Sequence, residues 1–163
     1  REQCFKIRDA VRNHEVAGQL LEGGQAEKTF LWQDPTTGAK CKCRTDYLNN
    51  DNMIIDLKTT EDASARNFGR SAMNHRYDVQ AAFYSDGMEI ASGVRPDVFV
   101  FIAVEKTPPY AVACYYAGED MLTLGSQKYH RDLSVYAACK KDNKWPGYPD
   151  EITAIQIPNY AKY

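Results

Sequence analysis

The stretch "MIIDLKTT" (residues 53–60) interleaves apolar side chains with Asp56 and Lys58. A β-strand places residues i and i+2 on the same face, so the acid and the lysine point the same way from a strand that otherwise looks covered. Buried charges need partners. Either the two side chains neutralise each other, or a further group lies between them.

The composition is that of an ordinary globular protein. The chain has 163 residues, of which 44% are hydrophobic and 26% charged, and this length suits one domain with a sizeable core. The formal net charge is −2. Bulk charge therefore does not announce a nucleic-acid partner, although basic residues can still gather on one face. We expect a single domain over residues 1–163.

Neither the apolar runs nor the cysteines indicate a special class of protein. No run approaches the ~20 apolar residues that cross a bilayer, so no membrane association is expected. The five cysteines are odd in number and irregularly spaced. This pattern favours reduced thiols in a cytosolic protein over a zinc site.

The first half of the chain predicts a helix followed by three strands. Apolar residues recur at helical spacing over 5–22. Strands are expected at 30–33 and 40–48, joined by a turn at "DPTTG" (34–38), where proline and glycine have the required backbone angles. The third strand is expected at 53–58.

The second half predicts helices and two more strands. After "TTEDASA" a helix is expected, capped by Thr60 or Asp62. A second helix, a strand covered on both faces, another strand and a long helix follow at 74–91, 98–104, 110–117 and 118–140. The aromatic tail from 145 is expected to lie along the body or against a neighbour. The order predicts an α/β (α+β) fold, with a mixed central sheet of about five strands flanked by helices.

The first candidate site consists of two aspartates from neighbouring strands. Asp46 ends the second predicted strand and Asp56 lies near the end of the third. Antiparallel neighbours lie ~4.8 Å apart, so the two carboxylates can converge, and they repel unless a cation joins them. Mg²⁺ prefers oxygen ligands and commonly takes one or two carboxylates. Beside such an ion Lys58 could orient a water or stabilise charge on a phosphate.

Two alternatives stay open at these residues. The D-x-K pattern is common by chance, and Asp56 and Lys58 could form an ion pair without a function. Gln80 and Tyr84 are four apart on a predicted helix and share a face. They could join the site, or they could be a surface glutamine and a tyrosine with its ring in the core.

Three stretches together carry a resemblance to a known family. "KCKCRTDYL" (40–48), "MIIDLKTT" and "YDVQAAFYSDG" (77–87) resemble the exonuclease VIII (RecE) type of phage-recombination nuclease. These enzymes belong to the PD-(D/E)xK superfamily and carry the RecB-like Q-x₃-Y helix. The similarity runs in order from about residue 11 to the C-terminus.

The resemblance implies a fold and an activity. The fold would be a restriction-endonuclease-like core. The activity would be a magnesium-dependent 5′→3′ exonuclease on double-stranded DNA ends, with Mn²⁺ as an alternative ion, which leaves an overhang for a single-strand annealing protein. It also implies a ring-shaped homo-oligomer, a trimer or tetramer, in a cytoplasmic protein encoded by a bacterium or a prophage.

The resemblance also implies roles for particular residues. Asp46 and Asp56 would ligate the metal, with the backbone carbonyl of Leu57 as a further oxygen ligand. Lys58 would be the catalytic lysine. Gln80 and Tyr84 would match the Q-x₃-Y pair that positions the lysine or the DNA end.

One part of the family pattern is not found. The family has a further metal ligand, often His or Glu, on a helix upstream of the hairpin. Glu27 is a weak candidate for an acid at that point. We expect the upstream helical segment to be missing from this chain, which would leave the metal site incomplete.

Four residues are candidate DNA contacts. Arg44 precedes Asp46 by two residues and could meet a phosphate or pair with an acid. Thr59 and Thr60 could bond a phosphate oxygen, although Thr60 could equally cap a helix. Arg76 belongs to a basic stripe that suits a DNA backbone or a solvated face.

Three functions therefore remain as hypotheses. The first is a Mg²⁺-dependent exonuclease. The second is a non-catalytic module of the same fold that binds DNA ends or assembles subunits. The third is a repair or restriction-type endonuclease.

Overall fold

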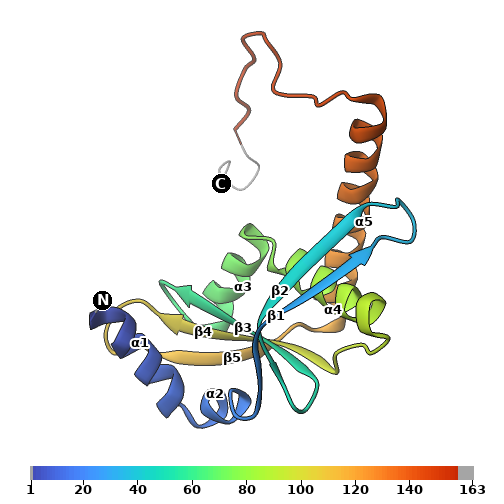
Figure 1. Cartoon of the computed structure of the whole chain (residues 1–163). Helices are drawn as coiled ribbons and strands as arrows, with labels where there is room; N and C mark the ends of the chain where they lie inside the picture. The colour runs from blue at the N-terminus through green and yellow to red at the C-terminus, as the bar shows by residue number, and fades with distance from the viewer. Residues whose placement is uncertain (1, 158–163) are drawn as a thin grey trace.

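The computed structural model of the chain describes residues 2–157. It contains one mixed sheet of five strands in the order β1-β2-β3-β4-β5, with helices on both faces (Figure 1). The predicted fold class is therefore confirmed. In the described part of the chain no helix is long and apolar enough to cross a membrane.

The N-terminal segment forms two helices where one was predicted over 5–22. Helix α1 spans Glu2–Asn13 and α2 spans Glu15–Leu20. His14 breaks the run: it has extended backbone angles, and its Nδ1 accepts a hydrogen bond from the Ala17 N–H at 3.2 Å. The prediction of one helix was wrong because this side-chain cap starts a second helix in a new direction.

A long hairpin follows, made of β1 (Gly24–Gln33) and β2 (Lys40–Asn49) in antiparallel register. The predicted "DPTTG" turn joins them. The Asp34 carboxylate accepts hydrogen bonds from the Thr37 N–H and hydroxyl at 2.7 and 2.6 Å. Gly38 has φ +68°, the conformation for which glycine was expected there.

Strand β3 (Met53–Thr60) joins the hairpin to the rest of the sheet. It pairs in parallel with β4 (Val98–Glu105) along its whole length, and β4 pairs antiparallel with β5 (Val112–Tyr116). Six successive residues of β4, Phe99 to Val104, are buried. The predicted apolar strand covered on both faces is thus confirmed.

Two apolar clusters hold helices on the two faces of the sheet. On one face, Ile54 of β3 packs with Phe68 and Met88 from the helices α3 (Ala65–Asn74) and α4 (Tyr77–Ser92). On the other face, Ile55 packs with Val11 and Ala17 of α1 and α2. Neighbouring residues of β3 therefore reach opposite layers, as the two-residue period of a strand requires.

The start of α3 differs from the prediction. The helix begins after Ser64, not at Thr60 or Asp62, and Ser64 makes no side-chain cap. Thr60 is still part of β3. Asp62 instead orders the loop, because its carboxylate accepts hydrogen bonds from the Ser64 N–H at 2.7 Å and from Asn67 at 2.6 Å.

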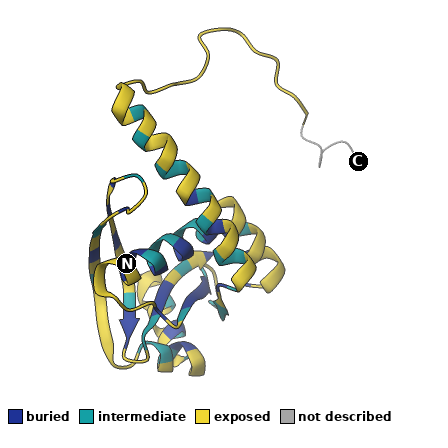
Figure 2. Cartoon of the chain, turned by 90° about the vertical axis from the view of Figure 1, so that its right-hand side faces the viewer, coloured by how far each residue is buried: buried dark blue, intermediate teal, exposed yellow. Residues whose placement is uncertain are grey.

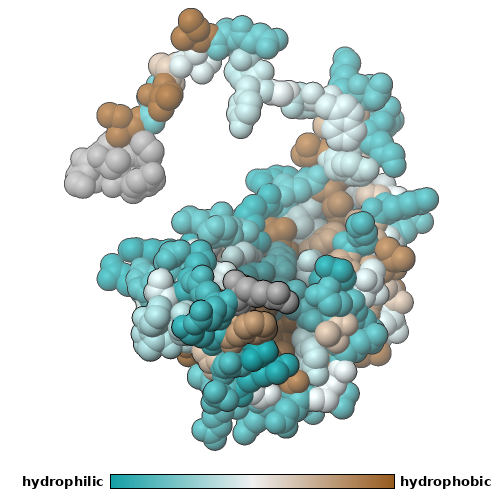
Figure 3. Space-filling view, turned by 60° about the vertical axis from the view of Figure 1, so that its left-hand side comes forward, coloured by the Kyte–Doolittle hydropathy of each residue, from teal (hydrophilic) through white to brown (hydrophobic). Residues whose placement is uncertain are grey.

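Helix α5 (Glu119–Asp142) is the longest element and projects beyond the body. Figure 2 shows exposed residues along its outer half and along the chain that follows. The tail up to 157 does not lie along the body: Tyr148 is 98% exposed and Ile155 97%. Hydrophobic side chains stand out along this segment (Figure 3). The prediction that the tail lies along the body was therefore wrong. A neighbour as the alternative surface stays a prediction.

Candidate active site

The candidate site lies where β2 and β3 separate. The two strands pair through Leu48 with Ile54 and Tyr47 with Ile55, so Asp46 and Asp56 would be the next pair. The ladder ends before them. Instead the Asp46 carboxylate accepts a hydrogen bond from the Leu57 N–H at 2.9 Å, which brings a side-chain carboxylate to the place of a backbone carbonyl beside β3.

Asp56 is the most deeply buried member of the site. Its side chain is 2% exposed. Oδ1 accepts a hydrogen bond from Gln80 Nε2 at 2.5 Å, and Oδ2 lies 2.5 Å from Lys58 Nζ. Oδ2 makes no hydrogen bond of ordinary geometry in the described part of the chain, and the Lys58 ammonium is its ionic partner.

Burial raises the pKa of Asp56 above its ordinary value. Loss of water around the carboxylate is the main cause, the charge of Lys58 opposes it, and the negative charge of Asp46 adds to it. The effect of Asp46 requires that the two acids lie near each other. The ionised carboxylate of Asp56 therefore destabilises the fold, and a further cation beside it would offset this effect.

One face of α4 supplies the polar side chains opposite β3. Gln80 and Tyr84 are one turn apart on it. Tyr84 packs edge-on against Phe99, with ring centroids 6.3 Å apart. Burial, then the nearby Cys43 thiol and both site carboxylates, raise the pKa of its hydroxyl. Tyr84 thus has its ring against the core and its hydroxyl near the acids. It is both a core residue and a member of the candidate site, the two roles that the sequence left open.

Tyr77, at the start of the same helix, is a site residue that the sequence analysis missed. Lys58 Nζ lies over its ring, 4.6 Å from the centroid. The signal available in the sequence was its position three residues before Gln80, which places it on the same face of a helix. An aromatic residue at that spacing is typical of a core position, so the sequence did not distinguish Tyr77 from a packing residue.

Glu27 and Arg44 contact each other. Arg44 Nε lies 2.8 Å from the Glu27 carboxylate, and both side chains are more than half exposed. Glu27 has φ +56° and is skipped in the β1–β2 ladder, opposite Asp46. Of the two interpretations of Arg44, the structure shows the pairing with an acid. Glu27 is near the site in the sheet, but its carboxylate is engaged elsewhere.

The other candidate DNA contacts differ in accessibility. Thr59 is exposed and lines a cavity of about 400 Å³ beside Tyr77. Thr60 is 8% exposed, and its hydroxyl donates to the Asp62 carbonyl at 3.1 Å. Arg76 forms an ion pair with Asp132 of α5. Only Thr59 of these three presents a side chain without a protein partner in residues 2–157.

The donor atoms at the site fit a hard divalent cation. Two carboxylates and a strand carbonyl are oxygen ligands of the kind Mg²⁺ takes while it keeps several waters. The observation that supports a cation there is the buried Asp56 carboxylate, whose Oδ2 has only an ionic contact with Lys58 and no hydrogen bond of ordinary geometry in residues 2–157. Across residues 2–157, no group of three or more His, Cys, Asp or Glu side chains is arranged around one point.

Known structures provide a comparison of fold. The chain is similar to a proposed exonuclease from Eubacterium rectale, with a TM-score of 0.72 and 15% sequence identity. The match covers 96% of this chain and 63% of that one, so this chain spans less than two thirds of that protein. A second structure, SSO0001, matches with a TM-score of 0.46 and 12% identity over 86% of this chain and 57% of the other. No curated protein matches the chain.

The sequence profile of one family covers nearly the whole chain. The profile of the PDDEXK-like domain of unknown function (DUF3799) matches residues 2–158. This match and the similar fold confirm the predicted membership of the PD-(D/E)xK superfamily. The protein therefore belongs to the family of PDDEXK-like domains described as DUF3799.

Proposed function

We propose that this chain is a nuclease domain that hydrolyses DNA with a divalent cation, Mg²⁺ or alternatively Mn²⁺. The observation that carries the proposal is the Asp56 carboxylate, buried between Gln80 and Lys58 with one oxygen lacking a hydrogen bond. Buried charge of this kind is costly. Perturbed carboxylates with a specific charged partner cluster at functional sites.

The chain's own residues suit this chemistry. Asp46, Asp56 and the Leu57 carbonyl would hold the ion, which when bound polarises a phosphoryl oxygen and lowers the pKa of a coordinated water. Gln80 fixes the Asp56 carboxylate through Oδ1. Lys58 places an ammonium beside the same carboxylate, where it can orient a water and stabilise charge on the phosphate.

We further propose an exonuclease that degrades linear double-stranded DNA in the 5′→3′ direction. The support is the family resemblance, in which Gln80 and Tyr84 match the Q-x₃-Y pair, and the fold shared with a proposed exonuclease. On the same ground we propose a ring-shaped homo-oligomer and a single-strand annealing partner, in a cytoplasmic protein of bacterial or prophage recombination.

The proposed DNA contacts differ in whether their side chains are already paired within the protein. Thr59 is exposed, so its hydroxyl can bond a phosphate oxygen. Arg44 and Arg76 contact phosphates only if DNA replaces Glu27 and Asp132 as their partners. Both of these pairs are exposed, and exposed ion pairs are weak, so exchange for a phosphate has a small cost.

A second candidate function rests on the ion pair itself. The 2.5 Å contact between Asp56 and Lys58 also suits a non-catalytic module in which the two charges neutralise each other. Such a module would not bind Mg²⁺. A ligand at 100 times its dissociation constant stabilises the native state by ~2.7 kcal/mol, so thermal melting with Mg²⁺ separates the two functions.

The decisive experiment uses linear and covalently closed duplex DNA with Mg²⁺. We expect the wild-type chain to degrade the linear DNA only, with strands labelled at the 5′ or 3′ end reporting the direction. Asp56→Ala and Lys58→Ala should abolish cleavage. Asp51→Ala, in the exposed turn before β3, is the matched control and should cleave normally. Cleavage of closed circles would indicate an endonuclease, and undiminished cleavage by the Asp56 variant would contradict the proposal.

A further inference from the structure

Lys58 has two contacts of different kinds. Its side chain is 17% exposed, and Nζ lies 2.5 Å from the Asp56 carboxylate on one side. On the other side Nζ lies 4.6 Å from the centroid of the Tyr77 ring. A cation within about 6 Å of an aromatic face is attracted by the ring's quadrupole, and the attraction grows when the cation is shielded from water.

The two contacts differ in what a bound divalent ion would do to them. Under the proposed function the Asp56 carboxylate holds that ion, and this inference rests on that function. Two cations compete for one carboxylate and repel each other. The Asp56 contact of Lys58 is therefore weakest in the state that must cleave DNA. The Tyr77 ring is neutral and not among the candidate ligands, so its contact persists.

The Tyr77 ring is well held for this task. It is half-buried at the first position of α4 and packs against Phe101 and Phe68, with centroids 5.9 and 6.2 Å away. His75 stacks on it at 5.6 Å. A ring fixed by three aromatic neighbours loses little conformational freedom when it holds a lysine.

The spacing along α4 supports the same interpretation. Tyr77, Gln80 and Tyr84 lie at positions i, i+3 and i+7, one face of a helix. Gln80 holds the Asp56 carboxylate through Oδ1, and Tyr84 lies near both acids. The polar face of α4 therefore begins one turn earlier than the Q-x₃-Y pair.

We propose that Tyr77 is a positioning residue, whose ring keeps the Lys58 ammonium at the reacting phosphate when a divalent cation occupies the Asp56 carboxylate. Tyr77 is not a candidate ligand of the ion in this arrangement. It acts only through Lys58.

The first test is spectroscopic and needs no variant enzyme to be active. An aromatic ring shifts the proton resonances of a methylene that lies over its face. In protein labelled with ¹³C-lysine, and assigned with Lys58→Arg, we expect the Lys58 ε-methylene protons to resonate upfield of the other lysines. The shift should persist when Mg²⁺ is added. A Lys58 signal without this shift, or one that loses it on addition of Mg²⁺, overturns the proposal.

The second test uses matched substitutions. Tyr77→Phe keeps a ring and should keep both the upfield shift and most of kcat. Tyr77→Leu removes the ring, and we expect kcat to fall about tenfold while KM for DNA and the thermal shift caused by Mg²⁺ stay unchanged. Equal kcat in Tyr77→Leu and wild type overturns the proposal.

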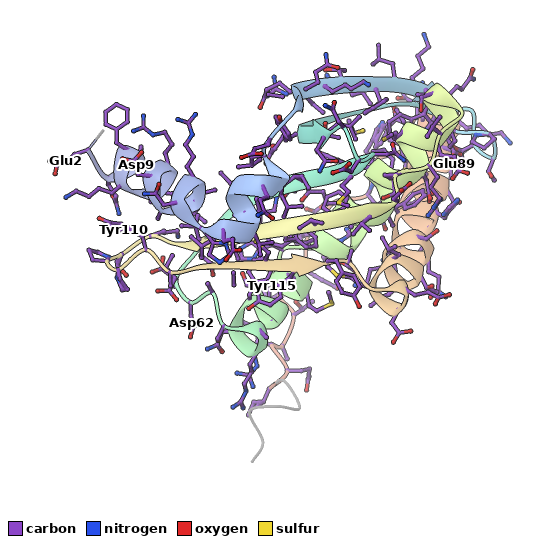
Figure 4. The ribbon with its side chains drawn as sticks, turned by 90° about the horizontal axis from the view of Figure 1, so that it is seen from below. Glu2, Asp9, Asp62, Glu89, Tyr110 and Tyr115 are labelled. Carbon is purple, nitrogen blue, oxygen red and sulfur yellow. The ribbon has the colours of Figure 1, made fainter. Side chains whose placement is uncertain are left out.

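The control for lost packing is Tyr115→Leu. Tyr115 on β5 (labelled in Figure 4) stacks on the same Phe68 at 5.3 Å, and its hydroxyl donates to the Ala63 carbonyl at 2.7 Å. In the described chain the cation–π contact of Lys58 is with Tyr77 and not with Tyr115. Tyr115→Leu should lose stability and keep kcat. If it loses kcat as Tyr77→Leu does, the effect is general packing and the proposal is overturned. If the wild type does not cleave DNA at all, the proposed function fails, and the Lys58 resonance still decides whether Tyr77 holds the lysine.

Discussion

The buried carboxylate of Asp78 in α4 lies 2.6 Å from Nζ of Lys128 in α5. Asp78 is completely buried, and within residues 2–157 its Oδ1 has no hydrogen-bond partner. One turn earlier on α5, Gly125 is packed so closely that an added Cβ would lie 2.0 Å from the Asp78 carbonyl oxygen. The two helices therefore cross at the residue that follows Tyr77, and this crossing positions the face of α4 that carries Gln80.

The Asp78–Lys128 pair gives the first prediction. Lys128→Met leaves a buried carboxylate without its cation, and breaking a buried pair from one side costs about 3 kcal/mol. Chemical denaturation should show this loss in the free energy of unfolding. Adding Asp78→Asn should restore part of it, because the unpaired charge is gone. Lys141→Met, at the exposed end of α5, is the control, and a loss of similar size there would refute the explanation.

The close approach at Gly125 gives the second prediction. Gly125→Ala places a methyl group against backbone that cannot rotate away, so α5 must shift, at a cost of roughly 1–3 kcal/mol. Gly69 in α3 has no atom within 4 Å of an added Cβ, so Gly69→Ala should stabilise by about 0.5–1 kcal/mol through helix propensity. Thermal melting of the two variants should give opposite signs. The same sign for both would contradict the crossing geometry.

The raised pKa of Asp56 predicts that its charge destabilises the metal-free fold. Between the ordinary aspartate pKa and the raised one the native state binds more protons than the unfolded state, so this contribution to stability falls as pH rises through that window. It stays lost at pH 7. Asp56→Asn carries no charge and should melt higher than the wild type without metal, where ~3 °C corresponds to 1 kcal/mol in a domain of this size.

Asp62→Asn is the control with the opposite sign. Hydrogen bonds from Ser64 and Asn67 lower the pKa of Asp62, and its side chain is labelled in the loop before α3 in Figure 4. Its ionised form therefore contributes stability above the ordinary aspartate pKa, which is lost on acidification. Asp62→Asn should melt lower than the wild type at pH 7. A lower melting temperature for Asp56→Asn as well would show that Asp56 is not under electrostatic strain.

The raised pKa of Asp56 also predicts how the stabilisation of the fold by Mg²⁺ depends on pH. A carboxylate binds a metal only when it is ionised, and the raised pKa of Asp56 means that a proton competes with the ion. The Mg²⁺-induced rise in melting temperature should therefore grow as pH increases through that raised pKa. It should be absent in Asp56→Asn at every pH. A shift independent of pH would place the ion elsewhere.

The parts of the fold that sequence predicts are those set by local pattern. The run from Val98 to Val104 is apolar at every position, so the burial of Phe99 to Val104 follows without knowledge of its neighbours. The "DPTTG" turn is likewise determined by its own residues, the Asp34 carboxylate that accepts a hydrogen bond within it and Gly38 with its positive φ. Placement of Asp56 beside Gln80 depended on the family resemblance, because a helix pattern does not say which strand the helix will cover.

The parts that escaped prediction depend on contacts between distant residues. The apolar spacing of 5–22 continues through His14, and only the hydrogen bond to the Ala17 N–H reveals a second helix. Tyr77 looks like a core aromatic until β3 places Lys58 over its ring. The engagement of Glu27 by Arg44 required the β1–β2 register.

The outer half of α5 carries a consequence for local opening. No residue of this helix beyond Tyr129 is buried, so its last turns keep their backbone hydrogen bonds with little tertiary support, and a short helix without packing is marginal in water. Amide protons there should exchange with deuterium far faster than those around Gly125. The exchange rates should rise steadily toward Lys141. Such a gradient means that the end of α5 unfolds locally and refolds many times while the sheet stays folded.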